Sequence, residues 1–464
     1  MQTFSIILAA GMGKRMQSKL YKMLHPVGGK PMVGHVLDLL EQMNATRNVA
    51  IVGHGAEDIQ AYIGDRAECV LQEEQLGTGH AVMQAGPLLE NEEGTTIVIC
   101  GDTPLISQET LGRMVEMHRE HGAAATIMTA VMDDPHGYGR VIRDADGFVT
   151  GIVEQKDCSE EQRRIREINA GTYVFDNRKL FEALAKVTNH NVQNEYYLTD
   201  VFGILKAEGE TIVGYCTPDP DEAVGINDRV LLAEAERLMN QRKLLELMRS
   251  GVTIQDPSST YVEKDVQIGA DTTLLPGSVL KGATVIGSDC VIGPYTELTD
   301  TRIGDRVVVR QSVLEEAVVG SGTSVGPFAY MRPGAETGEN VKVGDFVEIK
   351  NAKLGDGTKV SHLSYVGDAV VGKDVNVGCG AITVNYDGFV KHRTEVGNGA
   401  FIGSNVNLIA PVKIGDGAYV VAGSTITDPV GEGDMAIARE RQTTKPGYAN
   451  VLRAKIQKRS KKEN

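Results

Sequence analysis

Cysteine is scarce in this sequence, and its few cysteines form no paired motif. Six cysteines are scattered over 464 residues without a CxxC pair, so neither a disulfide framework nor a zinc site is predicted. Scattered thiols are typical of proteins in the reducing cytosol, and we therefore expect a cytoplasmic location.

Long hydrophobic runs are also missing. No window approaches the roughly 18 consecutive apolar residues that a transmembrane helix requires. The apolar run at residues 4–10 is not preceded by a charged segment and is too short for a signal peptide. We expect a protein that neither spans a membrane nor is secreted.

Positive charge and aromatic side chains are in short supply. The net charge is −15, aromatic residues make up 5% and tryptophan is absent, so nucleic acids and membrane surfaces are not expected partners. The one basic run is RAKIQKRSKKEN at the C-terminus, which we expect to be a solvated or frayed end rather than a nucleic-acid arm. Glycine, by contrast, is abundant with 53 residues, which indicates tight backbone turns.

The chain is too long for one ordinary core, so two or three domains are expected. Up to residue 228, continuous apolar runs alternate with amphipathic segments. The runs predict strands at 4–10, 48–54, 95–102 and 125–131, and the segments predict helices at 32–43 and 79–89. Alternating strands and helices indicate an α/β fold with a Rossmann-like, mostly parallel sheet, which binds ligands at the carboxyl ends of its strands.

A helix is predicted at the point where the composition of the chain changes. Residues 229–249 contain neither glycine nor proline, and Asn227 or Asp228 can cap their first turn. We expect a long linker helix here. The predicted domains are therefore residues 1–228, the linker at 229–249 and a second domain at 250–464.

The second domain has a six-residue period. An aliphatic residue followed by glycine recurs from Ile268-Gly269 to Ile414-Gly415, and eight of the thirteen spacings between these glycines are multiples of six. This period predicts a parallel β-helix of about ten coils, whose aliphatic side chains point inward. The longest spacing contains NYDGFVKHRTE, residues 385–395, which we expect to loop out of the coil and to carry function.

The stretch LAAGMGKRM, residues 8–16, contains two glycines and two basic residues after the first predicted strand. It matches neither the Walker pattern nor the dinucleotide-binding pattern, because the glycine that each requires is missing. Glycines let backbone N–H groups approach phosphate oxygens, and Arg15 and Lys22 can neutralise a transferring phosphoryl group. The residues alone leave two interpretations open: a phosphate site or an ordinary turn.

Candidate metal ligands have the same ambiguity. Asp102 ends a buried strand, where a Mg²⁺ ligand belongs, but it could equally cap a helix or form a turn. Asn227 could be a second oxygen ligand or the cap of the linker helix. Glu154 could accept hydrogen bonds from a hydroxylated ligand.

LAAGMGKRM followed by Lys22 resembles the L-x-x-G-x-G-T-R-M…K signature of the sugar-nucleotide pyrophosphorylases. LQEEQLGTGHA, CGDTPL, HGYGRVI, VEQKD, INAGTYVF, GINDR, SHLSYVGD and NYDG are similar to one branch, the bacterial bifunctional N-acetylglucosamine-1-phosphate uridyltransferases/glucosamine-1-phosphate acetyltransferases. The resemblance covers nearly the whole chain. Lys14, Tyr21 and Cys379 depart from the usual residues, and none of them removes a charge that the chemistry needs.

For the N-terminal half, the resemblance implies uridylyl transfer from UTP to N-acetylglucosamine 1-phosphate, with release of pyrophosphate. It assigns Mg²⁺ to Asp102 and Asn227, and stabilisation of the phosphates to Arg15 and Lys22. The other implied contacts are Leu8, Ala9, Ala10 and Gly11 for the nucleotide, Gln72, Gly77 and Thr78 for uracil, Gly101 beside Asp102, and Gly139, Glu154 and Asn169 for the sugar.

For the C-terminal half, the resemblance implies acetyl transfer from acetyl-CoA to glucosamine 1-phosphate. His362 could be an ordinary surface histidine, but the resemblance favours a base that deprotonates the amino group of glucosamine 1-phosphate. The sugar phosphate would be bound by Arg332, Lys350 and Tyr365. The sugar and the histidine would be positioned by Asn376 and Asn385. Acetyl-CoA would be contacted by Asn385, Tyr386, Ser404, Ala422 and Arg439. The family also implies a left-handed coil and a homotrimer with sites between subunits.

Two other hypotheses compete with this bifunctional enzyme. The first is a monofunctional sugar-1-phosphate nucleotidylyltransferase whose β-helix serves only assembly, and His362, Lys350, Arg332 and the NYDG loop argue against it. The second is a scaffold or binding protein, which Asp102 and Lys22 in their expected contexts argue against.

Overall fold

The computed structural model describes residues 2–53, 56–145 and 147–460. The chain divides into two compact units, Met1–Leu245 with Val262–Lys264, and Glu246–Tyr261 with Asp265–Asn464. No helix within the described residues is long and apolar enough to cross a membrane.

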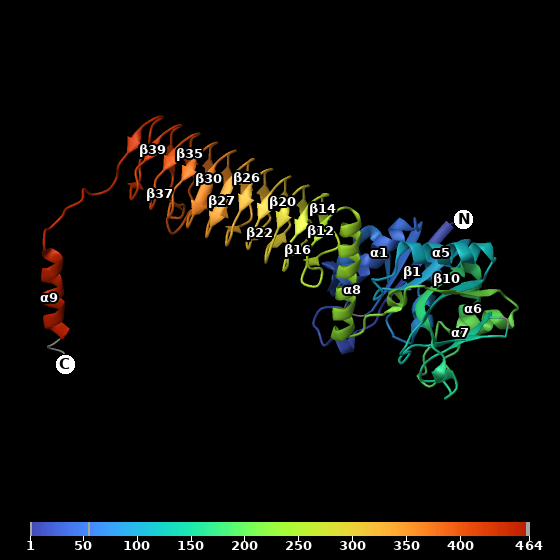
Figure 1. Cartoon of the computed structure of the whole chain (residues 1–464). Coiled ribbons are helices and arrows are strands. Elements are labelled where there is room, and N and C mark those ends of the chain that lie inside the picture. Colours follow the sequence, from blue (N-terminus) through green and yellow to red (C-terminus); the bar gives the residue numbers. More distant parts are fainter. Residues whose placement is uncertain (1, 54–55, 146, 461–464) are drawn as a thin grey trace. The chain divides into compact units, whose positions relative to one another are not determined.

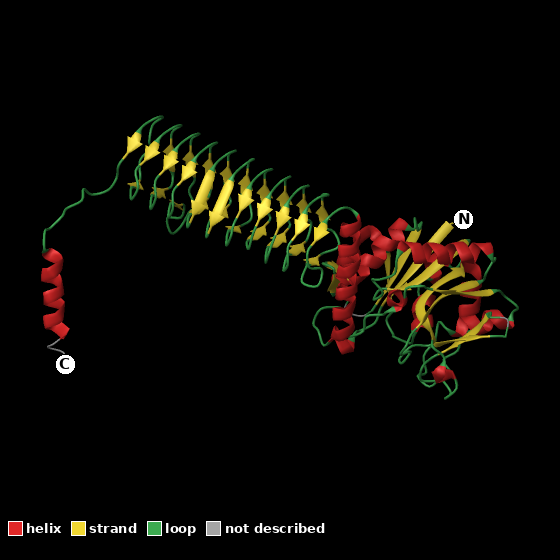
Figure 2. Cartoon of the chain, viewed as in Figure 1, coloured by secondary structure: helices red, strands yellow, loops and turns green. Residues whose placement is uncertain are grey.

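A nine-stranded sheet forms the centre of the N-terminal unit (Figure 2). Seven strands follow the order β11-β7-β10-β6-β1-β4-β5, and β8 and β9 join at β10. Most neighbours on this path are parallel, but β10 is antiparallel to both β6 and β7. The strands are β1 (Gln2–Ala9), β4 (Arg47–Val52), β5 (Glu68–Leu71), β6 (Gly94–Cys100), β7 (Ala125–Val131), β8 (Arg140–Arg143), β9 (Val149–Val153), β10 (Glu167–Asp176) and β11 (Ile212–Cys216), with β2 (Pro26–Val27) and β3 (Lys30–Pro31) as a separate pair.

The predicted strands of this unit are β1, β4, β6 and β7, except that His54 lies outside the described residues. Their apolar runs are continuous because both faces of the sheet are covered. Ile6 belongs to one buried cluster, with Phe175, and the next residue, Ile7, belongs to another, with Leu37. Each buried aliphatic side chain of this kind contributes about 1.5–3 kcal/mol.

Helices flank this sheet (Figure 1). They are α1 (Met32–Gln42), α2 (Glu57–Ile63), α3 (Thr78–Met83), α4 (Gly86–Leu89), α5 (Gln108–Glu120), α6 (Asn177–Leu184) and α7 (Asp200–Ala207), with 3-10 turns η1 (Lys14–Met16), η2 (Lys22–Leu24), η3 (Gly64–Arg66), η4 (Gln162–Arg164) and η5 (Pro220–Ala223). The single helix predicted over 79–89 is wrong: the segment forms α3 and α4. Pro87 lacks an N–H and fits only a first helical turn, so a new helix starts beside it.

The linker segment forms α8 (Arg229–Arg249). Asp228 caps it, because its Oδ1 accepts the N–H groups of Val230 and Leu231 at 2.9 and 3.0 Å. The amide of Asn227 is therefore not needed as the cap.

Three parallel sheets form the second unit, with 11, 10 and 9 strands. The first sheet runs from β12 (Thr253–Ile254) to β41 (Met435–Ala436), the second from β13 (Tyr261–Val262) to β40 (Thr425–Ile426), and the third from β14 (Gln267–Ile268) to β38 (Val412–Ile414). Figure 2 shows these short strands stacked along one axis. Successive strands pair in register, as where Thr273 faces Val291 and Leu274 faces Ile292. The six-residue period thus produces the predicted parallel β-helix.

The chain turns sharply at each corner of the coil. Corners between the first and second sheets carry left-handed residues such as Phe346 (φ 54°) and Leu363 (φ 47°), and those between the second and third carry Asn351 (φ 43°) and Asp368 (φ 47°). Between the corners the aliphatic residues point inward, and Leu298 and Ile349 are 0% exposed. We call the first set the 1–2 corner and the second set the 2–3 corner.

Two segments leave the coil. The segment predicted to loop out at 385–395 does so over 385–393, between β34 (Ile382–Val384) and β35 (Thr394–Val396), and its last two residues are part of the coil. The C-terminal stretch forms α9 (Tyr448–Ser460), whose residues are all exposed. The basic end is thus solvated as expected, but it is helical rather than frayed up to Ser460, and residues 461–464 lie outside the described part.

Candidate active sites

Three polar side chains from distant parts of the sequence meet in the N-terminal unit. The ammonium of Lys22 donates to Oδ2 of Asp102 and, at 2.8 Å, to Oδ1 of Asn227. The side chains of Lys22 and Asp102 are only 8% and 14% exposed. Lys22 begins η2, Asp102 follows β6 and Asn227 precedes α8, so the sheet places all three where its parallel strands end.

The oxygens of Asp102 and Asn227 both face one cation, the Lys22 ammonium. A carboxylate and an amide oxygen are ligands that Mg²⁺ accepts, and Mg²⁺ commonly uses one or two protein ligands together with substrate phosphates. Within the described residues, no group of three or more His, Cys, Asp or Glu side chains could hold a metal. The donor set fits Mg²⁺ together with phosphate oxygens, but not a metal held by protein alone.

A cavity of about 310 Å³ lies beside this cluster. Its lining includes Lys22 and Asp102, the glycine-loop residues Leu8, Ala10 and Gly11, and the predicted uracil contacts Gln72, Gly77 and Thr78. Ala9 and Gly101 lie behind it: the Ala9 carbonyl accepts from the Tyr21 hydroxyl at 2.7 Å, and the Gly101 N–H donates to Leu8 at 3.0 Å.

Glycine is required at one wall of this cavity. Gly77 has a φ of 111°, and a Cβ there would lie 2.6 Å from the Tyr196 carbonyl oxygen. The buried Gln72 donates through Nε2 to the Gly77 carbonyl at 3.2 Å and contacts His80 Nδ1 at 3.1 Å. These contacts fix the Gln72 carboxamide in one orientation.

The three predicted sugar contacts also lie together. The Asn169 N–H donates to the Gly139 carbonyl at 2.9 Å, and a Cβ on Gly139 would lie 3.5 Å from Oε2 of Glu154. Burial raises the pKa of Glu154, and the nearby carboxylates of Asp157, Asp200 and Glu195 raise it further, against a hydrogen bond from Thr199 that lowers it. Cys100 lines the 310 Å³ cavity and its thiol donates to the Gly171 carbonyl, and the Gly171 N–H donates to Oδ1 of Asn169 at 2.9 Å, which links this group to the cavity.

Arg15 is predicted to act with Lys22 on the phosphates, but the structure does not place it with Lys22, Asp102 and Asn227. It is exposed in η1, and it is not part of the cavity lining. Sequence reasoning missed Gln75, Cys100 and Glu195 in the lining. Gln75 donates to the Ala10 carbonyl at 2.5 Å. It lies inside the LQEEQLGTGHA segment, so this motif could have identified it as a residue of the site. Burial raises the pKa of Cys100 to about 12, which keeps its thiol neutral.

In the β-helix, four predicted residues lie at or toward the 2–3 corner. Arg332 follows the second-sheet strand Tyr330–Met331, Lys350 ends the second-sheet strand Glu348–Lys350, and Arg332 pairs with Glu348 at 2.9 Å. The Tyr365 hydroxyl accepts from Asn385 at 3.3 Å, and Asn385 also donates to Asp368. Burial opposes ionisation of Asp368, but hydrogen bonds from Asn351 and Asn385 lower its pKa overall.

Sequence reasoning missed Lys391 at this corner. The Lys350 side chain lowers the pKa of Lys391, because the two ammonium groups face each other. Lys391 also lines a cavity of about 500 Å³ with Asp368, His392 and Arg393. Its loop is held by Asp387, whose Oδ1 accepts two backbone N–H groups and whose Oδ2 lies 2.7 Å from His392 Nε2. No periodicity marks this loop, so only its length signalled a function.

The remaining predicted residues, except Tyr386, lie on the first sheet or at the 1–2 corner. His362 ends β30 (Lys359–His362), and its Nδ1 is 2.5 Å from Oδ1 of Asp345, whose pKa the hydrogen bond with His362 lowers. Ser404, Ala422 and Arg439 are exposed in successive coils: the Ser404 carbonyl accepts from Gly423 at 2.8 Å, and Arg439 packs at Gly423. Asn376 begins β33 (Asn376–Val377), while Tyr386 lies on the 385–393 loop, 57% exposed.

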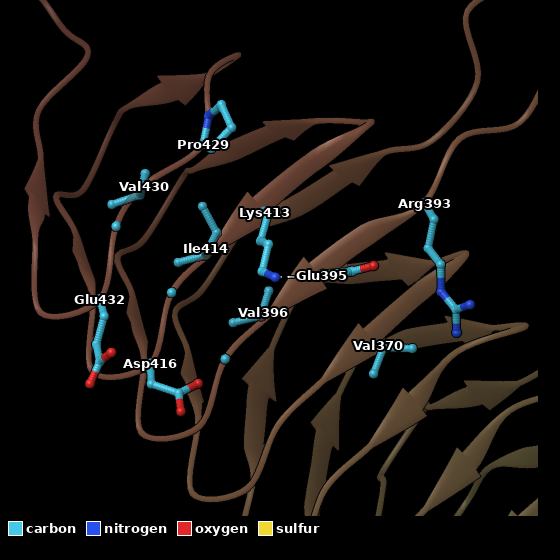
Figure 3. Close-up of a pocket in the computed structure, with 13 residues that line it drawn as sticks. Val370, Arg393, Glu395, Val396, Lys413, Ile414, Asp416, Pro429, Val430 and Glu432 are labelled. Atoms are coloured by element: carbon cyan, nitrogen blue, oxygen red, sulfur yellow. Dashed lines mark ion pairs between the residues drawn. The ribbon is translucent and has the colours of Figure 1, made fainter.

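The predicted acetyl-transfer residues therefore form two groups at two corners. Among the described residues, no side-chain hydrogen bond joins His362 to the group of Lys350, Tyr365 and Asn385. A further cavity of about 680 Å³ opens on the third sheet, where Lys413 and Glu395 form an ion pair at 3.9 Å (Figure 3). None of the predicted residues lines it.

The two units match two family models. Residues 4–220 match the nucleotidyl transferase family, and residues 265–300 and 393–428 match the bacterial transferase hexapeptide (six repeats) family. The chain is 58% identical over 449 residues to the bifunctional protein GlmU of Enterococcus faecalis, covering 97% of this chain and 98% of that protein. It is also 57% identical to the GlmU of Brevibacillus brevis and 55% identical to that of Geobacillus thermodenitrificans, covering 98% and 97% of this chain and 99% and 98% of theirs.

These identities extend through both the sheet with its glycine-loop cavity and the left-handed hexapeptide coil, so the likeness is not limited to one unit. This chain belongs to the GlmU family of bifunctional proteins, with a nucleotidyltransferase unit and a hexapeptide-repeat acetyltransferase unit.

Proposed function

We propose that this chain makes UDP-N-acetylglucosamine in two steps. The C-terminal unit transfers the acetyl group of acetyl-CoA to glucosamine 1-phosphate, and the N-terminal unit then transfers the uridylyl group of UTP to the N-acetylglucosamine 1-phosphate formed. The observation that carries the proposal is the convergence of Lys22, Asp102 and Asn227 on a cavity lined by the glycine loop. All six cysteines are free thiols, which supports a cytoplasmic location.

For uridylyl transfer, the residues act by position and charge. A phosphate oxygen of N-acetylglucosamine 1-phosphate attacks the α-phosphorus of UTP, and the bond to pyrophosphate breaks. Asp102 and Asn227 would hold Mg²⁺, which neutralises phosphate charge when bound. Lys22 faces the phosphates, with Arg15 beside the loop. The uracil lies against Gln72, Gly77 and Thr78, and the sugar against Gly139, Glu154 and Asn169.

For acetyl transfer, His362 is the base. It accepts a proton from the amino group of glucosamine 1-phosphate as the nitrogen attacks the thioester carbon. The amide bond forms, the C–S bond breaks, and the imidazolium gives the proton to the sulfur, so that coenzyme A leaves as its thiol. The Asp345 carboxylate lies 2.5 Å from Nδ1 of His362 and orients the ring. Arg332, Lys350 and Lys391 supply the cations for the sugar phosphate.

The separation of the predicted residues into two corner groups supports a site between subunits. We infer that His362, Ser404, Ala422 and Arg439 of one chain meet the cationic group of a second chain, with its Asn385 and Tyr386, in a homotrimer. An exposed apolar ridge supports association: Tyr295, Phe328, Phe346 and Leu363 lie at the 1–2 corner with exposures of 72, 51, 57 and 56%. The rings of Phe328 and Phe346 stack at 5.2 Å, while Gln311 occupies this corner in the coil between Tyr295 and Phe328.

Two assays on the full chain test the proposal. The first supplies glucosamine 1-phosphate and acetyl-CoA, and the second supplies N-acetylglucosamine 1-phosphate, UTP and Mg²⁺. We expect N-acetylglucosamine 1-phosphate from the first and UDP-N-acetylglucosamine with pyrophosphate from the second. If the first assay gave no acetylated product while the second worked, the β-helix would be an assembly module only.

Lys391→Met should raise the KM for glucosamine 1-phosphate by about tenfold or more with a smaller effect on kcat, because it removes one of the cations facing the phosphate. Steady-state kinetics of acetyl transfer measure this change. Lys353→Met is the matched control, since Lys353 lines the same cavity but pairs with Glu336 at 2.8 Å. An unchanged KM in the Lys391 variant would contradict the assignment.

Phe346→Asp should convert the protein to a monomer, because it places a charge in the middle of the apolar ridge. Analytical ultracentrifugation measures the mass, and we expect acetyl transfer to fall with it while uridylyl transfer persists. Phe148→Asp changes a phenylalanine of the N-terminal unit that is 53% exposed and should leave the mass unchanged. If the Phe346→Asp protein kept the wild-type mass, the apolar ridge would not be part of the subunit interface.

A further inference from the structure

The ammonium of Lys22 lies at the point on which the two candidate metal ligands converge. It contacts Oδ2 of Asp102 and Oδ1 of Asn227, one carboxylate oxygen and one amide oxygen. In a buried site, such a pair of oxygens requires a positive charge nearby. Lys22 supplies this charge.

The surrounding contacts fix the backbone at Asp102 and the side-chain amide of Asn227 independently of Lys22. The Asp102 carbonyl accepts the N–H of Ile226 at 3.0 Å, which ties the loop after β6 to the segment before α8. Asn227 donates through Nδ2 to the Gly225 carbonyl at 3.3 Å, which sets the orientation of its amide oxygen. The amide oxygen of Asn227 is thus oriented without Lys22, and the loop that carries the Asp102 carboxylate is held beside it.

The glycine loop holds the Lys22 stem close to these oxygens. Gly13 adopts a φ of 58°, and a Cβ there would lie 2.6 Å from Cβ, 3.1 Å from Cγ and 3.2 Å from Cδ of Lys22. Only glycine permits this approach. Lys22 also lines the nucleotide cavity, so an ammonium displaced from Asp102 can remain inside that cavity.

We propose that Lys22 is an internal competitor for the divalent-cation site formed by Asp102 and Asn227. The inference rests on the proposed uridylyl transfer and deepens it. A cation beside Asp102 and the Lys22 ammonium cannot share these oxygens, because like charges at hydrogen-bond distance repel strongly in a site screened from water. The Lys22 ammonium moves from the oxygens of Asp102 and Asn227 to the phosphates only when a divalent cation and a nucleotide are both present. The nucleotide and the cation therefore promote each other's binding.

The test measures metal binding without turnover. Mn²⁺ alone, without nucleotide, is titrated into the full chain, and free Mn²⁺ is followed by electron paramagnetic resonance. We expect Lys22→Met to bind Mn²⁺ about tenfold or more tightly than the wild type, because the competing charge is gone. Lys22→Gln, which keeps a polar end that can hydrogen-bond Asp102, should gain affinity in the same direction and serves if the methionine variant unfolds.

Three further variants make the result specific. Lys22→Arg keeps the charge and should bind Mn²⁺ as weakly as the wild type. Lys19→Met removes an exposed charge outside the cavity lining and should also match the wild type. Asp102→Asn together with Lys22→Met should lose the gained affinity, which places the bound ion at this site.

Equal or weaker Mn²⁺ binding by folded Lys22→Met and Lys22→Gln proteins would overturn the inference. Because the readout needs no catalysis, the two proposals fail separately. Absent uridylyl transfer with tighter Mn²⁺ binding would refute the function alone, and uridylyl transfer with unchanged Mn²⁺ binding would refute the competition alone.

Discussion

His362→Ala should lower acetyl transfer by at least about 100-fold and leave uridylyl transfer at the wild-type rate. A positioned base contributes roughly 10²- to 10⁴-fold to proton transfer, and alanine cannot accept the proton of the attacking amine. The imidazole is half exposed and contacts Asp345, so its loss leaves the inward-pointing core of the coil untouched. Both rates are measured on the same preparation, which makes uridylyl transfer an internal control for folding.

The matched control is His121→Ala, an exposed histidine at the end of α5 in the other unit. We expect it to change neither rate. Asp345→Asn should give an intermediate loss of acetyl transfer, since it keeps the ring but removes the charge that orients it. Wild-type acetyl transfer in the His362 variant, or loss of both activities in a folded protein, would refute the two-site model.

Asp102→Ala should have the opposite effect, with uridylyl transfer reduced by at least about 100-fold and acetyl transfer retained. The substitution removes the only carboxylate that faces the Lys22 ammonium among the described contacts and leaves that charge buried without a counter-charge. We also expect a lower free energy of unfolding for the N-terminal unit, because removing one partner of a buried ion pair is strongly destabilising. Chemical denaturation followed by circular dichroism measures this loss.

Asp133→Asn is the control for Asp102, because Asp133 forms an ion pair with Arg166 while its side chain is 100% exposed. Exposed ion pairs contribute about 0–1 kcal/mol, so neither activity nor stability should change measurably. Asp102→Asn separates charge from shape, and we expect it to lose uridylyl transfer as the alanine variant does. Wild-type uridylyl transfer by the Asp102→Asn protein would show that the reaction does not require the Asp102 carboxylate.

The sequence predicted the coil well because its signal is periodic. An inward aliphatic residue before a glycine repeats once per face, and Leu298, Ile349 and similar residues are indeed fully buried. The strands of the first unit were predictable because both faces of the sheet are covered, so their apolar runs are unbroken. The break between α3 and α4 was missed, because an amphipathic pattern continues across Pro87 although the backbone cannot.

The site was predictable only in part. Local sequence cannot decide between Asn227 and Asp228 as the cap of α8; the fold decides it, since Lys22 from a distant segment contacts Asn227. Lys391 was missed because its proximity to Lys350 depends on how the 385–393 loop folds back over the coil. The separation of the acetyl-transfer residues into two corner groups depends on which coil corner each one occupies, which no short motif encodes.

The 385–393 loop leaves and re-enters the coil without changing its pairing. Val384 faces Ile409 just before the loop, and Thr394 faces Ala369 just after it. The loop can therefore differ in length and chemistry without a penalty to the stacking that supports it. The inward aliphatic residues of the repeats keep the frame, while Asn385 and Lys391 on the loop join Arg332, Lys350 and Tyr365 on the coil, so the loop can alter one side of the ligand site without refolding the core.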